Sequence, residues 1–313
     1  MRVLRGLHPL RASLPRVVAT IGVFDGVHLG HQRLLRLTVK RARALCGTSV
    51  AVTFFPHPQH VLRPSTARPL LTTLEERLRL IAAQGVDVAW VIPFTRVFAQ
   101  RSPEEFFDRV LRRQLALREV FVGEHFAFGK DRAGTVGWLK EAGARIGVTV
   151  HPVSTVVVHG VSVSSSRVRH AIEAGQLRLA RRWLGRPHLI VGTVVHGRGR
   201  GRTLGTPTAN LRLPSQVLPP TGVYAVHATL SARHQVWNGV MNLGTRPTFG
   251  ETQLVAEAHL FGHPGHLYGQ RLHIVLVDRL REERRFPTLE ALTRQITRDL
   301  RAARALLSHR SRT

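Results

Sequence analysis

Two histidines one helical turn apart have the clearest chemical capacity in this chain. They lie within residues 22–31, whose sequence is GVFDGVHLGH, after an apolar run at 17–21 that predicts a buried strand. Apolar residues at helical spacing follow near 32–45. A strand, a glycine-rich turn and a helix start leave backbone N–H groups available for an anion. We interpret this run as a nucleotide site, where His28 and His31 would add donors for charge developing on a phosphate.

Two other interpretations of the histidine pair stay open. Histidines at positions i and i+3 can bind a metal, although no third His, Cys or Asp stands at a convincing spacing. A plain structural turn is the other alternative. The complete pattern Gly-x-Phe-Asp-Gly-x-His-x-Gly-His is much more restrictive than any of its parts, and it favours the nucleotide site.

A second segment with chemical capacity covers residues 192–211, whose sequence is GTVVHGRGRGRTLGTPTANL. Its glycines permit close backbone approach to phosphates, and its arginines supply positive charge. Thr208 and Asn210 are two residues apart, so on an extended segment their oxygens face the same side. Such hard oxygens suit Mg²⁺. A flexible basic loop is the alternative when the glycine pattern is considered alone.

The elements that position the histidine pair alternate between strand and helix. This alternation predicts an α/β fold with a parallel, doubly wound, Rossmann-like sheet. Ligands bind such sheets at the carboxyl ends of strands, and the His28 turn follows one such end. The predicted strands are 17–21, 50–55, 86–94 and 120–122, and the predicted helices are 32–45, 73–84 and 103–116.

A predicted helix at 165–184 ends at Gly185-Arg186-Pro187, and we place a domain boundary there. The expected domains are therefore residues 1–186 and 187–313. Short β-like runs separated by Gly and Pro turns then predict a small antiparallel barrel, and apolar residues at helical spacing predict a closing helix. The runs are 189–195, 223–230, 236–243, 254–261 and 272–277, and the helix is 289–307.

Composition limits the class of protein. A length of 313 residues favours two domains. No apolar run is long enough to span a membrane, and Cys46 is the only cysteine, so we expect a cytoplasmic protein without membrane association. The net charge of +27 makes a basic nucleic-acid-binding regulator an alternative. We expect no specific nucleic-acid partner, because aromatic residues make up only 6% of the chain and no RNA-binding aromatic motif occurs.

The front segment, residues 22–31, resembles the signature of the flavin adenylyltransferases, which move an AMP group from ATP. Further segments extend the resemblance: 53–58, 121–134 and 163–169. In that family the matching segments line the ATP and flavin sites. Residues 163–169, VSSSRVR, are similar to the family motif Ile-Ser-Ser-Thr-x-Ile-Arg. Position 125 departs from the family, because His125 stands where Asp or Asn is usual.

The rear segment, residues 192–211, resembles the riboflavin kinases once its Pro-Thr-Ala-Asn end is included. Five later segments match the same family: 220–224, 241–249, 257–260, 268–269 and 280–286. Over roughly residues 15 to 305 the chain is therefore similar to the prokaryotic bifunctional riboflavin kinase/FAD synthetases. The resemblance implies that the C-terminal domain phosphorylates riboflavin to FMN. The N-terminal domain would then adenylylate FMN to FAD and release pyrophosphate. One retained activity and one degenerate domain is the alternative.

The resemblance also implies roles for individual residues. The catalytic residues would be His28, His31 and Glu257, with Glu257 as general base toward the ribityl hydroxyl. ATP in the adenylyltransferase would contact Gly22, Phe24, Asp25, Gly26, Ser165, Ser166 and Arg169. The flavin there would contact Phe55, Pro56, His57, Pro58, His125, Phe126 and Phe128. ATP in the kinase would contact Gly197, Gly199, Gly201, Arg202, Gly205, Thr206 and Pro207.

The implied ligands are ATP with Mg²⁺, which Thr208 and Asn210 would hold, and the flavins riboflavin, FMN and FAD as substrates or products. Two structural alternatives stay open for the implied residues. The serine-arginine segment is also typical of a helix cap followed by a solvated helix. Glu257 is also compatible with an exposed strand carboxylate that pairs with an arginine.

Overall fold

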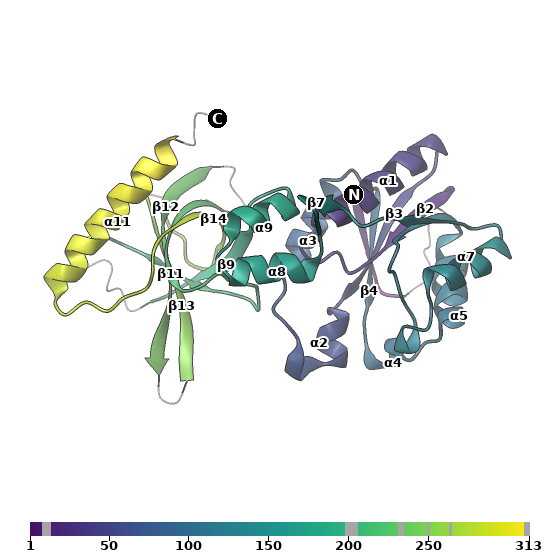
Figure 1. Cartoon of the computed structure of the whole chain (residues 1–313), viewed down its shortest axis with the longest axis horizontal. Helices are drawn as coiled ribbons and strands as arrows, with labels where there is room; N and C mark the ends of the chain where they lie inside the picture. The colour runs from purple at the N-terminus through teal and green to yellow at the C-terminus, as the bar shows by residue number, and fades with distance from the viewer. Residues whose placement is uncertain (8–13, 198–205, 231–234, 249–250, 263–264, 310–313) are drawn as a thin grey trace. The chain divides into compact units, whose positions relative to one another are not determined.

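The computed structural model describes residues 1–7, 14–197, 206–230, 235–248, 251–262 and 265–309. Contacts divide the chain into two compact units, Met1–Arg167 and Val168–Thr313 (Figure 1). The first contains a parallel sheet and the second a closed antiparallel barrel, so the predicted fold class is confirmed.

A six-stranded parallel sheet forms the centre of the first unit, in the order β1-β4-β3-β2-β5-β6. The predicted strands are all present, and β2 has the predicted bounds. The sequence did not predict β1, which is four residues long and mostly exposed, or β6, which contains a proline. The strands are β1 (Arg2–Arg5), β2 (Val17–Ile21), β3 (Ser49–Phe55), β4 (Val88–Pro93), β5 (Leu117–Gly123) and β6 (Thr149–Val153).

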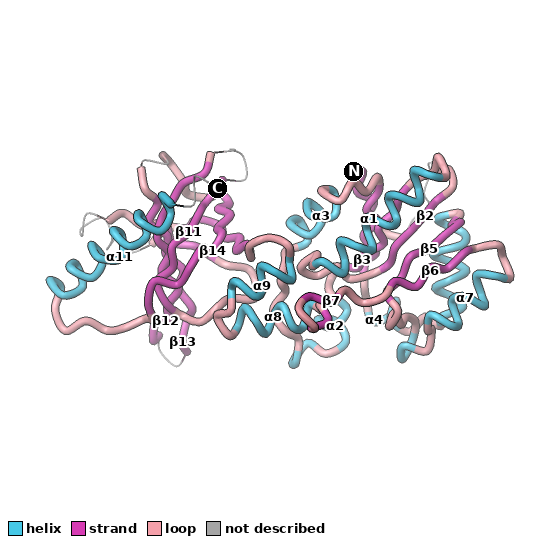
Figure 2. Tube along the Cα trace, turned by 45° about the horizontal axis from the view of Figure 1, so that its top comes forward, coloured by secondary structure: helices cyan, strands magenta, loops and turns pink. Residues whose placement is uncertain are grey.

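Helices cover both faces of this sheet. Figure 2 shows α1 and α7 on opposite sides of β2, β5 and β6. The α1 face is sealed by Leu35 and Val39, and the other face by Phe106, Leu111 and Leu139. The main helices are α1 (Leu29–Ala44), α3 (Leu74–Ala82), α4 (Arg96–Ala99), α5 (Pro103–Phe106) continued by η2 (Phe107–Arg112) and α6 (Arg113–Leu115), and α7 (Val136–Ala144).

The strand order creates a switch point beside β2. From β2 the chain moves outward through β3 and β4, and it then returns to β5 on the other side of β2. Crossovers therefore leave in opposite directions at the carboxyl end of β2, which opens a crevice for ligands in sheets of this kind. Residues 22–28 connect β2 to α1 at this end.

The prediction of a single helix at 165–184 is wrong in one respect, because the structure contains two helices there. They are α8 (Ser165–Glu173) and α9 (Leu177–Leu184), and Gly175 between them has a φ of 73°, which ends the first helix. The helical period continues through the break, so the apolar pattern alone did not reveal it. The domain boundary at Pro187, after both helices, stays a prediction.

A six-stranded antiparallel barrel, in the order β10-β13-β12-β11-β14-β9, forms most of the second unit. Its interior is apolar, with Tyr224, Met241 and Ile274 fully buried. The sequence did not predict β10, which is only four residues long. The elements are β9 (Leu189–Val195), β10 (Ala209–Arg212), β11 (Gly222–Leu230), β12 (Val236–Thr248), β13 (Glu251–Leu260), β14 (Arg271–Arg281) and α11 (Leu289–His309).

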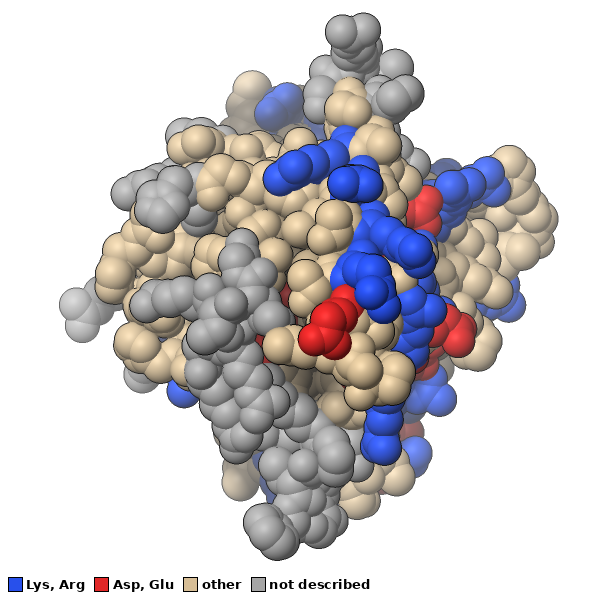
Figure 3. All heavy atoms as spheres, turned by 90° about the vertical axis from the view of Figure 1, so that its left-hand side faces the viewer, with Lys and Arg blue, Asp and Glu red and all other residues tan. Residues whose placement is uncertain are grey.

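Helix α11 packs against the outside of the barrel, where Ala303 and Leu307 contact a cluster that includes Val223 and Val240. Figure 3 shows a band of Lys and Arg along the face that carries this helix. Within the described residues, no helix is long and apolar enough to cross a membrane.

Helix α11 is anchored to β14 by an ion pair. Asp299 is buried and accepts hydrogen bonds from Arg281 Nε at 2.9 and 3.1 Å, and from Gln295 at 2.7 Å. Removing the carboxylate leaves a half-buried guanidinium without its main partner. We therefore expect Asp299→Ala to lower the free energy of unfolding by roughly 1–3 kcal/mol.

The measurement is calorimetric unfolding of the full chain. The control is Arg298→Gln, which changes an exposed residue of the same helix and should shift the free energy by less than about 0.5 kcal/mol. Equal effects of the two substitutions would contradict the anchoring role of Asp299.

Candidate active sites

The turn after β2 has a strained backbone. Phe24, Gly26 and Val27 have φ angles of 55°, 80° and 38°, in the left-handed region that L-residues other than glycine seldom adopt. A Cβ at Gly26 would also approach Leu71 Cδ1 to 2.6 Å, so this position requires glycine. Strain of this kind persists only where the surroundings hold it, and it concentrates at functional sites.

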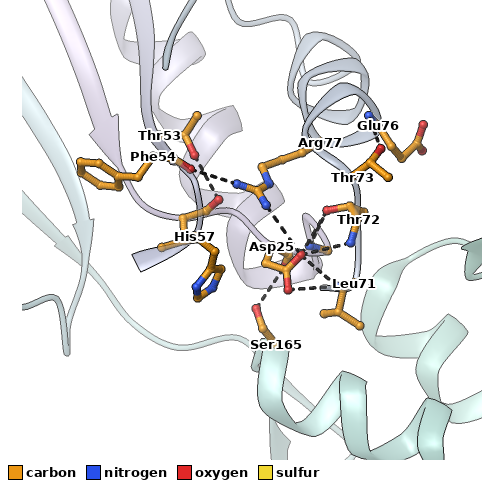
Figure 4. A network of polar contacts seen from close by, with 12 residues as sticks. Asp25, Thr53, Phe54, His57, Leu71, Thr72, Thr73, Glu76, Arg77 and Ser165 are labelled. Carbon is orange, nitrogen blue, oxygen red and sulfur yellow. Dashed lines mark hydrogen bonds and ion pairs between the residues drawn. The ribbon is translucent and has the colours of Figure 1, made fainter. Parts of the chain in front are cut away.

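Asp25 holds the turn in place. Its carboxylate is 2% exposed and accepts hydrogen bonds from Leu71 N at 3.0 Å and from Thr72 N at 3.1 Å (Figure 4). Thr72 Oγ1 also donates to it at 3.3 Å, and Gly26 N donates to Thr72 Oγ1 at 3.1 Å. The predicted nucleotide residue Asp25 therefore contacts its own chain, and its carboxylate fixes the turn.

The two histidines lie together at the start of α1. His28 is the N-cap residue, and its Nδ1 accepts the backbone N–H of His31 at 3.4 Å. Their rings stack with centroids 3.7 Å apart and planes 18° apart. Phe24 contacts the His31 ring edge-on at 5.3 Å. The structure thus brings the predicted pair together as one imidazole stack at a helix N-terminus, where an anion is favoured.

His31 is held in its neutral form. Burial lowers its pKa well below the usual value, and the nearby His28 and Arg77 lower it further. Its Nδ1 is buried and makes no hydrogen bond to any residue that the structure describes. A neutral imidazole can donate one hydrogen bond to a phosphate oxygen without the cost of two stacked imidazolium ions.

The end of β3 lies near this turn, and Figure 4 shows Thr53, Phe54 and His57 beside it. Thr53 Oγ1 donates to Val23 O at 3.1 Å, which ties β3 to the turn. His57 caps the short helix α2 (Pro58–Leu62), where its Nδ1 accepts Gln59 N at 3.1 Å. The ring of Phe55 is 42% exposed, so it is available to a planar ligand.

The predicted flavin residues after β5 occupy two environments. Phe126 and Phe128 stack at 5.4 Å, and Phe128 packs on Phe106 and Trp138, on the sheet face that α1 does not cover. The His125 side chain is 87% exposed and lies 3.8 Å from Glu124. The exposed imidazole is therefore not fixed by packing.

In the serine-arginine segment, residues 163–169, one serine caps a helix and another contacts the turn after β2. Ser164 Oγ accepts Arg167 N at 3.4 Å, which is typical of a helix cap. Ser165 Oγ instead donates to Asp25 O at 2.9 Å, which connects the start of α8 to the turn at residues 22–28, called the front turn below (Figure 4). Ser166 is exposed, and Arg169 is buried in the second unit.

In the barrel, β-sheet register aligns polar residues on its outer surface. Glu257 on β13 pairs with Asn210 on β10 and with Asn242 on β12. Directly opposed residues project to the same face of a sheet. Asn242 in turn pairs with Val223, which α11 covers, so this row faces outward. The sequence assigned no role to Asn242, because its position relative to Glu257 depends on strand pairing.

The predicted phosphate loop is described only in part. Gly199, Gly201, Arg202 and Gly205 lie outside the described residues. A side chain at Gly197 would overlap the Asn210 amide, so a larger residue there would displace the Asn210 side chain. Thr206 is half-buried and Pro207 is exposed, and Pro207 O contacts His259 Nδ1 at 2.9 Å.

The donor set of the barrel row suits a hard cation. Thr208 and Asn210 are half-buried and offer a hydroxyl and an amide oxygen, and Asn210 pairs with Glu257 in the strand register. Among the described residues, no group of three or more His, Cys, Asp or Glu side chains could hold a metal. The histidine pair therefore lacks the partners that its metal-site alternative requires in this part of the chain.

Comparisons with known proteins agree with the order of the two sites. The FAD synthetase family model matches residues 10–167, and the riboflavin kinase family model matches residues 184–307. A solved structure described as "Macrolide-efflux Protein" from Streptococcus pneumoniae has a TM-score of 0.82 and 29% identity, over 96% of this chain and 97% of that one. That description concerns the streptococcal protein alone.

Curated relatives extend over almost the entire chain. The bifunctional riboflavin kinase/FMN adenylyltransferase of Pseudomonas fluorescens is 43% identical over 307 residues, which cover 98% of each chain. The protein of the same description from Escherichia coli K12 is 39% identical over 305 residues, which cover 97% of each. The chain therefore belongs to the bifunctional riboflavin kinase/FMN adenylyltransferase family, with both family segments present in the expected order.

Proposed function

We propose that residues 1–186 transfer the AMP group of ATP to FMN, and that residues 187–313 phosphorylate riboflavin. The observation that carries this proposal is the presence of two separate sites of different construction, one within each family segment. The front site has an imidazole stack at a helix start beside the switch point. The rear site has a carboxylate flanked by two amides on a barrel wall.

At the front site, an oxygen of the FMN phosphate attacks the α-phosphorus of ATP, and pyrophosphate leaves in line. The attacking oxygen is already ionised, so the reaction requires positioning and charge stabilisation rather than a strong base. His28 and His31 donate to the phosphate oxygens on which charge develops. Ser165, Ser166 and Arg169 bind the β- and γ-phosphates at the start of α8, where a helix N-terminus favours negative charge.

Flavin binding at the front site uses the remaining predicted residues. The exposed ring of Phe55 and the turn at 56–58 offer an apolar edge to the isoalloxazine ring. Phe126 and Phe128 support the loop that carries His125.

At the rear site, the oxygen of the ribityl 5′-hydroxyl attacks the γ-phosphorus of ATP, and ADP leaves. Glu257 accepts the hydroxyl proton as general base, because a neutral alcohol is a poor nucleophile. The glycine loop between 197 and 205, with Arg202, and the segment at 206–207 bind the phosphates. Asn242 flanks Glu257 in the register and helps to fix its carboxylate.

Mg²⁺ would be held by Thr208 and Asn210 together with phosphate oxygens, and it neutralises phosphate charge when it is bound. In this arrangement the two side chains orient the triphosphate toward Glu257.

We expect His28→Ala to reduce FAD formation from FMN and ATP by about 100-fold or more, because a donor to the transition state is lost. FMN formation from riboflavin should stay near the wild-type rate. Separation of FMN and FAD by chromatography over time measures both reactions. The exposed His170→Ala is the matched control and should leave both rates unchanged. Loss of both reactions in folded His28→Ala would contradict the division of the two activities.

Glu257→Gln should have the opposite effect. FMN formation should fall by about 100-fold or more, because the amide cannot accept the proton. FAD formation from supplied FMN should persist. Glu282→Gln, at an exposed carboxylate after β14, is the control for the loss of one negative charge. Wild-type kinase activity in Glu257→Gln would exclude Glu257 as the base.

Asn210→Ala should raise the Mg²⁺ concentration required for half-maximal kinase activity, because one hard oxygen ligand is removed. A titration of activity against Mg²⁺ at fixed ATP checks this. The Mg²⁺ dependence of FAD formation in the same preparation should be unchanged. An unaltered Mg²⁺ requirement of the kinase would show that Asn210 is not a ligand.

A further inference from the structure

Arg77 is a buried cation behind the front turn for which the proposed reaction has no use. Its side chain is 0% exposed, and it lies in the first turn of α3, whose N-terminus disfavours positive charge. A buried arginine is costly unless all its donors are paired. Its Nε and Nη2 are buried without a hydrogen-bond partner among the described residues. The position therefore requires an explanation other than stability.

The guanidinium connects three parts of the front site. Its Nη1 donates to Phe54 O at 3.4 Å, at the carboxyl end of β3. Its Nη2 lies 4.0 Å from Asp25 Oδ1, in the turn that precedes the histidines (Figure 4). Its charge also reaches His31 on α1. One fixed side chain thus links the end of β3, the strained turn and the imidazole stack.

The neighbouring Arg79 shows that the environment of Arg77 is not a general feature of arginines on this helix. Arg79 is mostly exposed and makes a two-point pair with Glu76, with both hydrogen bonds at 2.8 Å. Among the described residues, Nη2 of Arg77 makes only a 4.0 Å ion pair with Asp25, whose carboxylate also accepts hydrogen bonds from Leu71 N and Thr72 N. The guanidinium is therefore held by a long ion pair rather than by a two-point pair.

We propose that Arg77 is a positioning residue of the adenylyl-transfer site, which joins the Asp25 turn, and with it the start of α1, to the end of β3. This inference rests on the proposed function of the front site. The charged and titratable groups that act on His31 are His28 on its own helix and Arg77 on α3, and Asp25 faces Arg77 from the turn. Arg77 does not contact the reacting atoms in this role.

The direction of the pH effect follows from the charges. A positive charge nearby lowers a histidine pKa, so removal of the Arg77 charge raises the pKa of His31. If neutral His31 is the active form, FAD formation declines as pH falls through this pKa. The acidic limb of the rate profile therefore moves to higher pH when a neutral residue replaces Arg77.

The test uses the full chain with Arg77→Met and Arg77→Gln as neutral variants and Arg77→Lys as the conservative variant. Arg79→Met is the matched control on the same helix. We expect the neutral variants to lower kcat for FAD formation by about tenfold or more, with a smaller change in KM for ATP. Their acidic limb should move to higher pH. Arg77→Lys should restore most of the rate and the wild-type profile, and Arg79→Met should match wild type.

A second readout does not depend on activity. Histidine ring signals are titrated by NMR in the full chain, with His31 assigned by its loss in His31→Asn. The pKa of His31 should rise in both neutral variants and stay at the wild-type value in Arg77→Lys. The dispersion of NMR signals from the first unit reports on its folding, so whichever neutral variant folds decides the outcome.

A folded neutral variant with the wild-type pH profile and the wild-type His31 pKa would overturn the proposal. Absence of FAD formation by the wild-type protein would instead refute the proposed function of the front site. In that case the NMR titration would still show whether Arg77 acts on His31, so the two failures are distinguishable.

Discussion

The front unit depends on one buried carboxylate. Asp25 lies in a turn where three residues have positive φ, and such strain must be balanced by surrounding interactions. A buried carboxylate is stable only where hydrogen bonds replace its hydration. Leu71, Thr72 and the more distant Arg77 provide that replacement. The turn is thereby connected to the segment before α3, and the start of α1 with its two histidines is set by the same contacts.

The two proposed sites are built from different kinds of structure. At the front, a parallel sheet supplies a switch point, and a helix start supplies oriented N–H groups. At the rear, antiparallel register places Asn210, Glu257 and Asn242 in one row. The front site therefore depends on a local turn, whereas the rear site depends on strands that are distant in sequence. A single substitution in the front turn can disrupt its geometry, while the row requires correct pairing of three strands.

The sequence predicted features that depend on neighbouring residues, and it missed features that depend on contacts between distant parts of the chain. The strands β2 and β9 have the predicted bounds, because continuous apolar runs between turn residues identify them. The break at Gly175 was missed, because helical periodicity continues across it. Asn242 and Arg77 received no role from the sequence. The first depends on register, and the second is one of many arginines in a basic chain, with nothing in the sequence to indicate that it is buried.

A permanent charge behind the neutral His31 ring suits a reaction in which negative charge moves during transfer. Had both imidazoles been protonated, they would repel each other within the stack and would bind the ground-state triphosphate as strongly as the transition state. Uniform binding of this kind does not lower the barrier. A neutral His31 ring donates a directional hydrogen bond, whereas the guanidinium of Arg77 adds a field that needs no rearrangement. Because Asp25 lies 4.0 Å from that guanidinium, the turn that shapes the site also contributes to its electrostatic potential.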